Sequence, residues 1–294
     1  MPESRPRIHP TAIVGGECQL GEGVEVGPYC VLEGRVKLDD GVRLISHVCL
    51  QGPIEIGART VVYPHSSLGF PPQDVKFKPG HATAGVRIGR DCQLRENVTI
   101  HAASKTDAPT RLGDRCFLMV SCHLGHDTRV GDDVTLVNNV LLAGHVEVES
   151  NVTMGGSAAV HQFCRIGRLA FVSGLTAVSM DIPPFCISAE RNRIQGLNLV
   201  GLRRAGVPRE QITALRAVFR RAFQVTLPRP EQIAVLEEAA DGCPPAREMA
   251  EFLRKSKRPI AGGMARPPRS VVVWMQRRLR GEMLEGADDE SLDG

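Results

Sequence analysis

In LGDRCFLMVSCHLGHDTRVGDDVTLVNNVLLAGHVEV (112–148), a large aliphatic residue returns at every sixth position, and this period indicates the fold. The series reads Leu112, Leu118, Leu124, Val130, Leu136, Leu142 and Val148. A period of six fits neither an α-helix at 3.6 nor an ordinary strand at 2. It is typical of a hexapeptide parallel β-helix, in which three short strands and their turns close a coil of about eighteen residues.

The same period covers most of the chain and is interrupted twice. It begins at Ile8 and ends at Val178. The interruptions at 71–85 and 102–111 are polar and contain the proline and glycine residues of loops. The sequence therefore predicts a β-helix over 1–190 with two inserted loops, which are expected to carry function.

Composition excludes several classes of protein. The chain has 294 residues and a net charge of +3, which gives no argument for a nucleic-acid partner. It contains no apolar stretch long enough to predict a membrane span, and the N-terminal MPESRPRIHP lacks the apolar core of a secretory signal. We expect a cytoplasmic protein.

The positions of the cysteines also fit a cytoplasmic protein, in which thiols stay reduced. Six of the nine lie four residues after a repeat aliphatic, namely Cys18, Cys30, Cys92, Cys116, Cys122 and Cys164. In a hexapeptide coil this second inward slot takes a small side chain, and a free cysteine behaves as a small hydrophobe. They are expected to be reduced core residues, so Cys122 is not expected to act as a nucleophile.

Helical spacing replaces the six-residue period after about residue 197. Helices are predicted at 211–223, 231–240, 246–255 and 270–284. The sequence thus predicts a small helical domain over 191–284 and a disordered acidic tail over 285–294. A basic face is expected from Arg203, Arg204, Arg216, Arg220 and Arg221, either for an acidic partner or as ordinary solvated surface.

Residues eighteen apart should stack in adjacent coils at about 4.8 Å, the spacing of neighbouring strands. The unbroken run then contains two columns: His126, Gly144 and Gln162 in one, and Asp127, His145 and Phe163 beside it. This arrangement predicts a general base with an acidic neighbour and an unobstructed backbone N–H for an oxyanion. Solvated surface histidines are the alternative.

Two further features concern the reaction. Gly156 and Gly174 form a column without side chains, which fits either a groove for an apolar chain or a tight corner.

His123 and His126 are three residues apart, whereas the zinc pair of some hexapeptide proteins is four apart, so no metal site is predicted. Direct acyl transfer from a thioester, without a cofactor, is the reaction that remains.

Longer motifs are more specific than the repeat. They are IHPTAIV (8–14), GPYCVL (27–32), QDVK (73–76), ENVTIH (96–101), CHLGHDTRVG (122–131), LAGHVEV (142–148), AVHQFCRIG (159–167), MDIPPF (180–185) and NLVGLRRAG (198–206). With them the chain resembles the UDP-N-acetylglucosamine O-acyltransferases of lipid A biosynthesis over roughly residues 8–225. The resemblance implies a left-handed β-helix and a homotrimer with active sites between subunits. It also implies acyl transfer from acyl carrier protein to the sugar 3-hydroxyl, the first step of lipid A biosynthesis.

The resemblance also assigns roles to residues. His126 matches the general base, with Asp127 beside it, and Gly144 matches the donor to the thioester oxyanion. Contacts to the sugar nucleotide or its pocket are implied for Gln73, Asp74, Lys76, His123, His145, Gln162, Asn198 and Arg204. Gly174 matches the position that gauges acyl-chain length.

The chain departs from the family pattern at four places. Ala102-Ala103-Ser104 stands where Arg-Gly-Thr is usual, Val200 replaces an acidic residue, and Ala205 replaces a basic one. The stretch AERNRIQG (189–196) is one residue shorter than in the family and lacks its Gly-Asn-His run. We expect these positions to lie toward the nucleotide and carrier end of the cleft, away from the acid–base centre. They leave open a 3-amino sugar nucleotide as acceptor or an acyl- or acetyl-CoA donor. A non-catalytic scaffold is a third possibility, which His126 and Asp127 disfavour.

Overall fold

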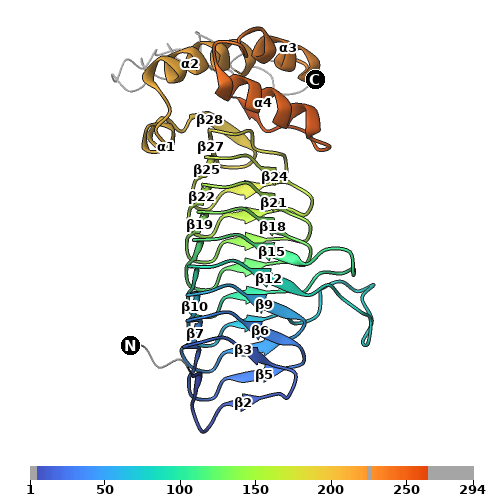
Figure 1. The fold of residues 1–294 in the computed structure, drawn as a ribbon. Helices are drawn as coiled ribbons and strands as arrows, with labels where there is room; N and C mark the ends of the chain where they lie inside the picture. The colour runs from blue at the N-terminus through green and yellow to red at the C-terminus, as the bar shows by residue number, and fades with distance from the viewer. Residues whose placement is uncertain (1–4, 224–226, 264–294) are drawn as a thin grey trace, which may run out of the picture.

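The main body of the protein is a parallel β-helix (Figure 1). The computed structural model describes residues 5–223 and 227–263. Within these ranges, consecutive strands go to three successive faces, so that sheets A, B and C contain twelve, nine and eight strands. The β-helix predicted from the six-residue period is confirmed.

The strands are short because each face of a coil is only two or three residues wide. Sheet A contains β1 (Arg7–Ile8), β4 (Glu25–Val26), β7 (Arg43–Leu44), β10 (Val61–Val62), β13 (Gln93–Leu94), β16 (Phe117–Leu118), β19 (Thr135–Leu136), β22 (Thr153–Met154), β25 (Phe171–Val172), β27 (Cys186–Ala189), β28 (Arg193–Leu197) and β29 (Gly262–Gly263). Sheet B contains β2 (Ile13–Val14), β5 (Val31–Glu33), β8 (Cys49–Gln51), β11 (Ser67–Leu68), β14 (Thr99–Ile100), β17 (His123–Leu124), β20 (Leu141–Leu142), β23 (Ala159–Val160) and β26 (Ala177–Val178). Sheet C contains β3 (Gln19–Leu20), β6 (Val36–Leu38), β9 (Ile54–Ile56), β12 (Val86–Ile88), β15 (Thr110–Leu112), β18 (Arg129–Val130), β21 (Glu147–Val148) and β24 (Arg165–Ile166).

The register of sheet B shows how far the eighteen-residue spacing holds. His123 pairs with Leu141, and Leu141 pairs with Ala159, so the spacing is eighteen in the unbroken run. Across the second loop Thr99 pairs with His123, and across the first Ser67 pairs with Thr99. The coils therefore absorb both insertions without losing strand pairing, and both loops leave the stack at the corner between sheets B and C. Thr110 already opens β15, so the second loop is slightly shorter than predicted.

The core is the aliphatic stripe together with the second inward slot. Leu124 and Leu142 are fully buried, whereas Ile8 in the first coil is 47% exposed because no coil covers it from below. Of the six cysteines predicted in the core, all but Cys18 are buried. The slot is less restricted to small side chains than expected, since a valine such as Val134 also fills it.

Helices cover the C-terminal end of the stack (Figure 1). They are α1 (Leu199–Arg204), α2 (Arg209–Phe223), α3 (Arg229–Glu238) and α4 (Pro244–Lys255). The three helices predicted within the described residues are confirmed, and α1 was not predicted. The predicted boundary at residue 190 falls inside the β27–β28 hairpin, which extends sheet A to Leu197.

The predicted helix at 270–284 and the predicted tail at 285–294 lie outside the described residues. Among the helices that are described, none is long and apolar enough to span a bilayer.

Candidate active site

A histidine and an aspartate form a hydrogen-bonded pair at the corner between β17 and β18. The Nδ1 atom of His126 lies 2.7 Å from the Oδ2 atom of Asp127, and each side chain is 14% exposed. Asp127 adopts a left-handed backbone conformation with φ of 60°, as His145 and Phe163 do at the same corner of the next two coils. Burial raises the pKa of Asp127, but hydrogen bonds from His126 and Ser104 outweigh burial and leave its pKa below the ordinary value. Asp127 is thus ionised and can stabilise a protonated His126.

The second inserted loop holds this aspartate in place. The Ser104 N–H lies 3.1 and 3.2 Å from the two carboxylate oxygens of Asp127. The Asp127 N–H donates to the Oγ1 atom of Thr110, which is fully buried. The expectation that Ala102-Ala103-Ser104 lies away from the acid–base centre is therefore wrong for Ser104. Ala102 and Ala103 are fully buried, so the alanines in this departure pack in the interior of the fold.

Gly144 lies in the next coil, against the ring of His126. A Cβ atom at this position would lie 2.6 Å from both Cε1 and Nε2 of His126, so only glycine fits without moving the ring. Among the described residues no acceptor takes the Gly144 N–H. A Cβ atom at Gly125 would lie 2.8 Å from this nitrogen, so a second glycine keeps the N–H accessible. An unused donor beside the free nitrogen of a base fits an oxyanion site.

A column of rings continues from the pair along the corner. His145 Nε2 lies 3.6 Å from Asp127 Oδ2, and the His145 ring is perpendicular to that of His126 at 5.1 Å. Phe163 stacks on His145 with ring centroids 4.5 Å apart and is 50% exposed. Burial lowers the pKa of His145, and the smaller effect of the Asp127 charge, which raises this pKa, does not cancel it. His145 is therefore neutral at physiological pH.

His123 is a second neutral histidine. Its Nδ1 atom lies 2.8 Å from the hydroxyl of Thr99 in the preceding coil. Burial, with smaller contributions from His101 and His126, lowers the pKa of His123 to about 4. An uncharged imidazole at this point can exchange hydrogen bonds with a hydroxyl of a ligand without repelling a protonated His126.

One cavity of about 540 Å³ opens on the outer face of sheet B; we call it the His126 cavity. It is lined by Gln73, His123, Gly125, His126, Leu141, Ala143, Gly144, Ala159, Val160, His161, Gln162, Ala177, Val178, Ser179 and Arg191. Its floor is apolar along β20, β23 and β26, and His126 and Gln162 lie at the corner between sheets B and C. His123 in β17 and Arg191 beside Ala177 supply polar groups at the two ends of this floor. An apolar floor beside a base and an oxyanion donor suits an acyl thioester.

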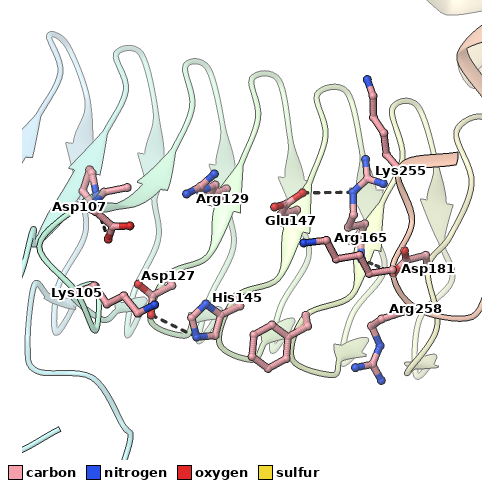
Figure 2. Close-up of a pocket in the computed structure, with 14 residues that line it drawn as sticks. Lys105, Asp107, Asp127, Arg129, His145, Glu147, Arg165, Asp181, Lys255 and Arg258 are labelled. Carbon is pink, nitrogen blue, oxygen red and sulfur yellow. Dashed lines mark hydrogen bonds and ion pairs between the residues drawn. The ribbon is translucent and has the colours of Figure 1, made fainter. Parts of the chain in front are cut away.

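A second cavity of about 500 Å³ lies on the outer face of sheet C (Figure 2); we call it the Arg129 cavity. It is lined by Lys105, Asp107, Ala108, Pro109, Asp127, Arg129, His145, Glu147, Phe163, Arg165, Asp181, Lys255, Lys257 and Arg258. Asp127 and His145 form part of its wall, so the His126–Asp127 pair separates the two cavities. Nothing in the sequence indicated this second cavity.

The structure brings some of the predicted site residues together. Of the predicted set, Gln73, His123, His126, Gly144 and Gln162 line the His126 cavity, and Asp127 and His145 line the Arg129 cavity. Arg191 and Ser179 line the His126 cavity without having been predicted. No pattern in the sequence marks them, because they follow the end of the repeat.

Other predicted residues line neither cavity within the described chain. Gly156 and Gly174 lie at the corner between sheets A and B, at the far edge of sheet B from His126. The carboxylate of Asp74 accepts a hydrogen bond from Lys76 N within the first loop.

Asn198 and Arg204 belong to α1 and also line neither cavity. Asn198 caps the helix: its Oδ1 accepts from Gly201 N at 2.9 Å, and its Nδ2 donates to Leu169 O. Arg204 lies in the last turn of the same helix.

His126, Asp127 and His145 are also the one group in the described part of the chain whose ligand atoms lie close enough for a metal ion, within 4.8 Å of one another. In the structure both oxygens of Asp127 already accept from Ser104, and one lies at hydrogen-bond distance from His126. We therefore interpret the group as a proton-transfer unit.

Known proteins share both the sequence and this architecture. The family model for domain 2 of UDP-N-acetylglucosamine O-acyltransferase matches residues 181–261. An acyl-[acyl-carrier-protein]–UDP-N-acetylglucosamine O-acyltransferase of Synechocystis is 41% identical over 252 residues, which is 85% of this chain and 90% of that protein. One from Anaeromyxobacter dehalogenans is 42% identical over 255 residues, covering 86% and 98%. This chain belongs to the UDP-N-acetylglucosamine O-acyltransferase family.

Solved structures of the UDP-N-acetylglucosamine O-acyltransferase family agree with the fold. The enzyme of Moraxella catarrhalis superposes with a TM-score of 0.82 at 32% identity, covering 86% of this chain and 99% of that one. The Acinetobacter baumannii protein gives 0.83 at 32% identity, with the same coverage.

Proposed function

We propose that the protein transfers a 3-hydroxyacyl chain from acyl carrier protein to the 3-hydroxyl of UDP-N-acetylglucosamine, the first step of lipid A biosynthesis. The observation that carries this proposal is the contact of His126 with Gly144, together with the hydrogen bond between His126 and Asp127. Membership of the family supports the substrates, since the relatives are named for transfer from acyl carrier protein to this nucleotide sugar.

In this mechanism the Nδ1–H of His126 donates to Asp127, which leaves the lone pair of Nε2 free to act as a base. Nε2 takes the proton from the sugar hydroxyl as its oxygen attacks the thioester carbonyl carbon, and the Gly144 N–H stabilises the resulting oxyanion. The tetrahedral intermediate collapses, the C–S bond breaks, and the leaving thiolate receives the proton from His126. The ionised Asp127 stabilises the imidazolium between these steps.

Transfer is direct, without an acyl-enzyme. Cys122 is fully buried, and burial raises the pKa of its thiol to about 11. A protonated, enclosed thiol is a poor nucleophile. The sugar oxygen is therefore the group that attacks the thioester.

We propose that the active form is a cytoplasmic homotrimer. Apolar side chains are exposed beside the His126 cavity and at the neighbouring corner: Leu141 is 47% exposed and Leu175 is 83% exposed. Exposed apolar groups of this kind suit an interface. In a trimer, the corner that contains Gly156 and Gly174 would face the cavity of an adjacent subunit and would complete an acyl groove.

A transfer assay tests the proposed function. Purified protein is incubated with a panel of acyl-carrier donors and UDP-N-acetylglucosamine, and products are identified by mass spectrometry, with a 3-amino acceptor and acyl-CoA donors in parallel. We expect a single O-acyl product, and His126→Ala should reduce the rate by at least about 10²-fold. His65→Ala, at an exposed histidine in an earlier coil, is the control. If only the 3-amino acceptor or only an acyl-CoA donor gave product, that compound would replace the proposed substrate. Substantial activity of His126→Ala would reject His126 as the general base.

A further inference from the structure

The Arg129 cavity is built from parts of the chain that are far apart in sequence. Lys105 comes from the second inserted loop, Arg129 from β18, and Lys257 and Arg258 from the segment after α4. In Figure 2 the side chains of Lys105, Arg129 and Arg258 are arranged around the hollow, with Asp127 and His145 in its wall. The cavity thus adjoins the acid–base pair from the side opposite Gly144.

Four of the six cationic side chains that line this cavity lack an acidic partner in the described chain, whereas Arg165 and Lys255 are paired. Lys105, Arg129 and Lys257 are exposed and make no ion pair with a described residue. Arg258 donates to the backbone oxygen of Ser179 and likewise has no carboxylate partner within the described chain.

Three of the four acidic side chains of the cavity are already hydrogen-bonded, paired or buried, whereas Asp107 is exposed and accepts only from the Ala108 N–H in the described chain. Asp127 is bonded to His126, and Glu147 pairs with Arg165, which also pairs with Glu149. Asp181 is fully buried, and burial raises the pKa of its carboxyl. Asp107 is thus the one free carboxylate set against Lys105, Arg129, Lys257 and Arg258, so the unpaired charge of the described lining is positive. Concentrated positive charge in a concave surface attracts an anion.

Phosphate esters are the anions that groups of lysine and arginine bind best. Both substrates of the proposed reaction carry one: the diphosphate of the nucleotide and the phosphodiester that attaches the pantetheine arm to its carrier. We propose that the Arg129 cavity binds the phosphate of one of these two substrates, while the reacting atoms lie in the His126 cavity. This inference rests on the proposed function. Binding energy from a remote phosphate would hold the substrate in position at His126.

Charge removal tests the inference. The variants are Arg129→Gln, Lys257→Gln and both together. Arg111→Gln is the matched control, because Arg111 occupies the same outward position of sheet C one coil earlier and lies outside the cavity. Steady-state kinetics are measured with UDP-N-acetylglucosamine and with acyl carrier protein varied separately. Calorimetric titration with UDP and with the carrier gives binding without turnover, and circular dichroism with thermal melting establishes that each variant folds.

Each single variant should raise the KM for one substrate about tenfold, as expected for the loss of one hydrogen bond to a charged group. The double variant should raise it further, kcat should stay within about twofold, and Arg111→Gln should change neither constant. If KM rises only for UDP-N-acetylglucosamine, or only for acyl carrier protein, the result identifies which substrate's phosphate the Arg129 cavity binds.

Unchanged KM and Kd values for both substrates in the double variant would overturn the inference while leaving the proposed function intact. If the wild type gives no acyl product but binds UDP or the carrier, and the variants weaken that binding, the inference stands and the proposed function fails. If the wild type binds neither, both fail.

Discussion

The α-carbon of Gly144 lies directly against the imidazole of His126, so that a methyl group at position 144 would lie 2.6 Å from Cε1 and from Nε2. The position of the His126 ring therefore depends on the absence of a side chain at Gly144, although the two residues come from different coils. The Asp127 hydrogen bond fixes the other side of the same ring. Three consequences of this contact, and two of its surroundings, can be measured.

Gly144→Ala should displace the imidazole without unfolding the solenoid. A shift of about 1 Å in a catalytic group costs about a hundredfold in rate, so kcat should fall by about that factor. Gly16→Ala is the control, because Gly16 occupies the same corner in the first coil and a methyl group there meets nothing within 4 Å. Near-normal kcat for Gly144→Ala would mean that the ring has another productive position.

Asp127→Asn should prevent His126 from acting as a base while leaving its side chain in place. Ser104 N–H requires an acceptor, so the amide oxygen of asparagine should face Ser104 and its NH₂ should face Nδ1 of His126. The imidazole proton then moves to Nε2, which can no longer accept a proton. We expect kcat to fall by about 10²–10⁴-fold with little change in KM. Steady-state assays across pH measure this, and an unaltered kcat would contradict the assigned tautomer.

Thr110→Val should disturb the position of Asp127 by removing a hydrogen bond to its backbone N–H. It leaves the N–H of Asp127 without its hydrogen-bond acceptor in the interior of the fold. The free energy of unfolding should fall by about 1–3 kcal/mol, and kcat should fall with it. Thr110→Ser retains the hydroxyl and should restore both quantities; equal damage from Ser and Val would show that the methyl group matters instead.

Acid should destabilise the fold in part through His123. Its pKa is about 4 in the folded protein and about 6.5 when unfolded, so the unfolded chain binds more protons between these values. The stability that neutral His123 contributes is complete above pH 6.5 and is lost as pH falls toward 4. Chemical denaturation from pH 7.5 to 4 should give a shallower loss for His123→Gln than for wild type. Identical slopes would reject the depressed pKa.

Cys122→Ala should leave the reaction intact. The thiol lies in the core and is protonated, so kcat should stay within about twofold while stability falls by about 1–2 kcal/mol from lost packing. Ala158 fills the same inward slot in another coil, which indicates that alanine is tolerated. Loss of turnover in a folded Cys122→Ala protein would point to an acyl-enzyme.

The columns of the site could be predicted because strand pairing in a solenoid follows the coil length. Where no residue is inserted, as between His123 and Leu141, sequence separation converts directly into spatial adjacency. That relation placed Gly144 beside His126. It also placed His145 next to Asp127. Burial of the repeat positions follows from the same period, since each coil covers the next.

The β-helix, its core and the stacking of His126 on Gly144 could thus be predicted from the residues alone, because all three depend on a constant spacing along the chain. The hydrogen bonds that Ser104 and Thr110 make with Asp127 emerged only from the folded structure, since the loop between them breaks that spacing. The folded structure alone also brought Lys105, Arg129 and Lys257 around one cavity. These contacts join the second loop and the end of α4 to the same face of the solenoid. The packing of helices and loops on a stack has no period from which such contacts could be read.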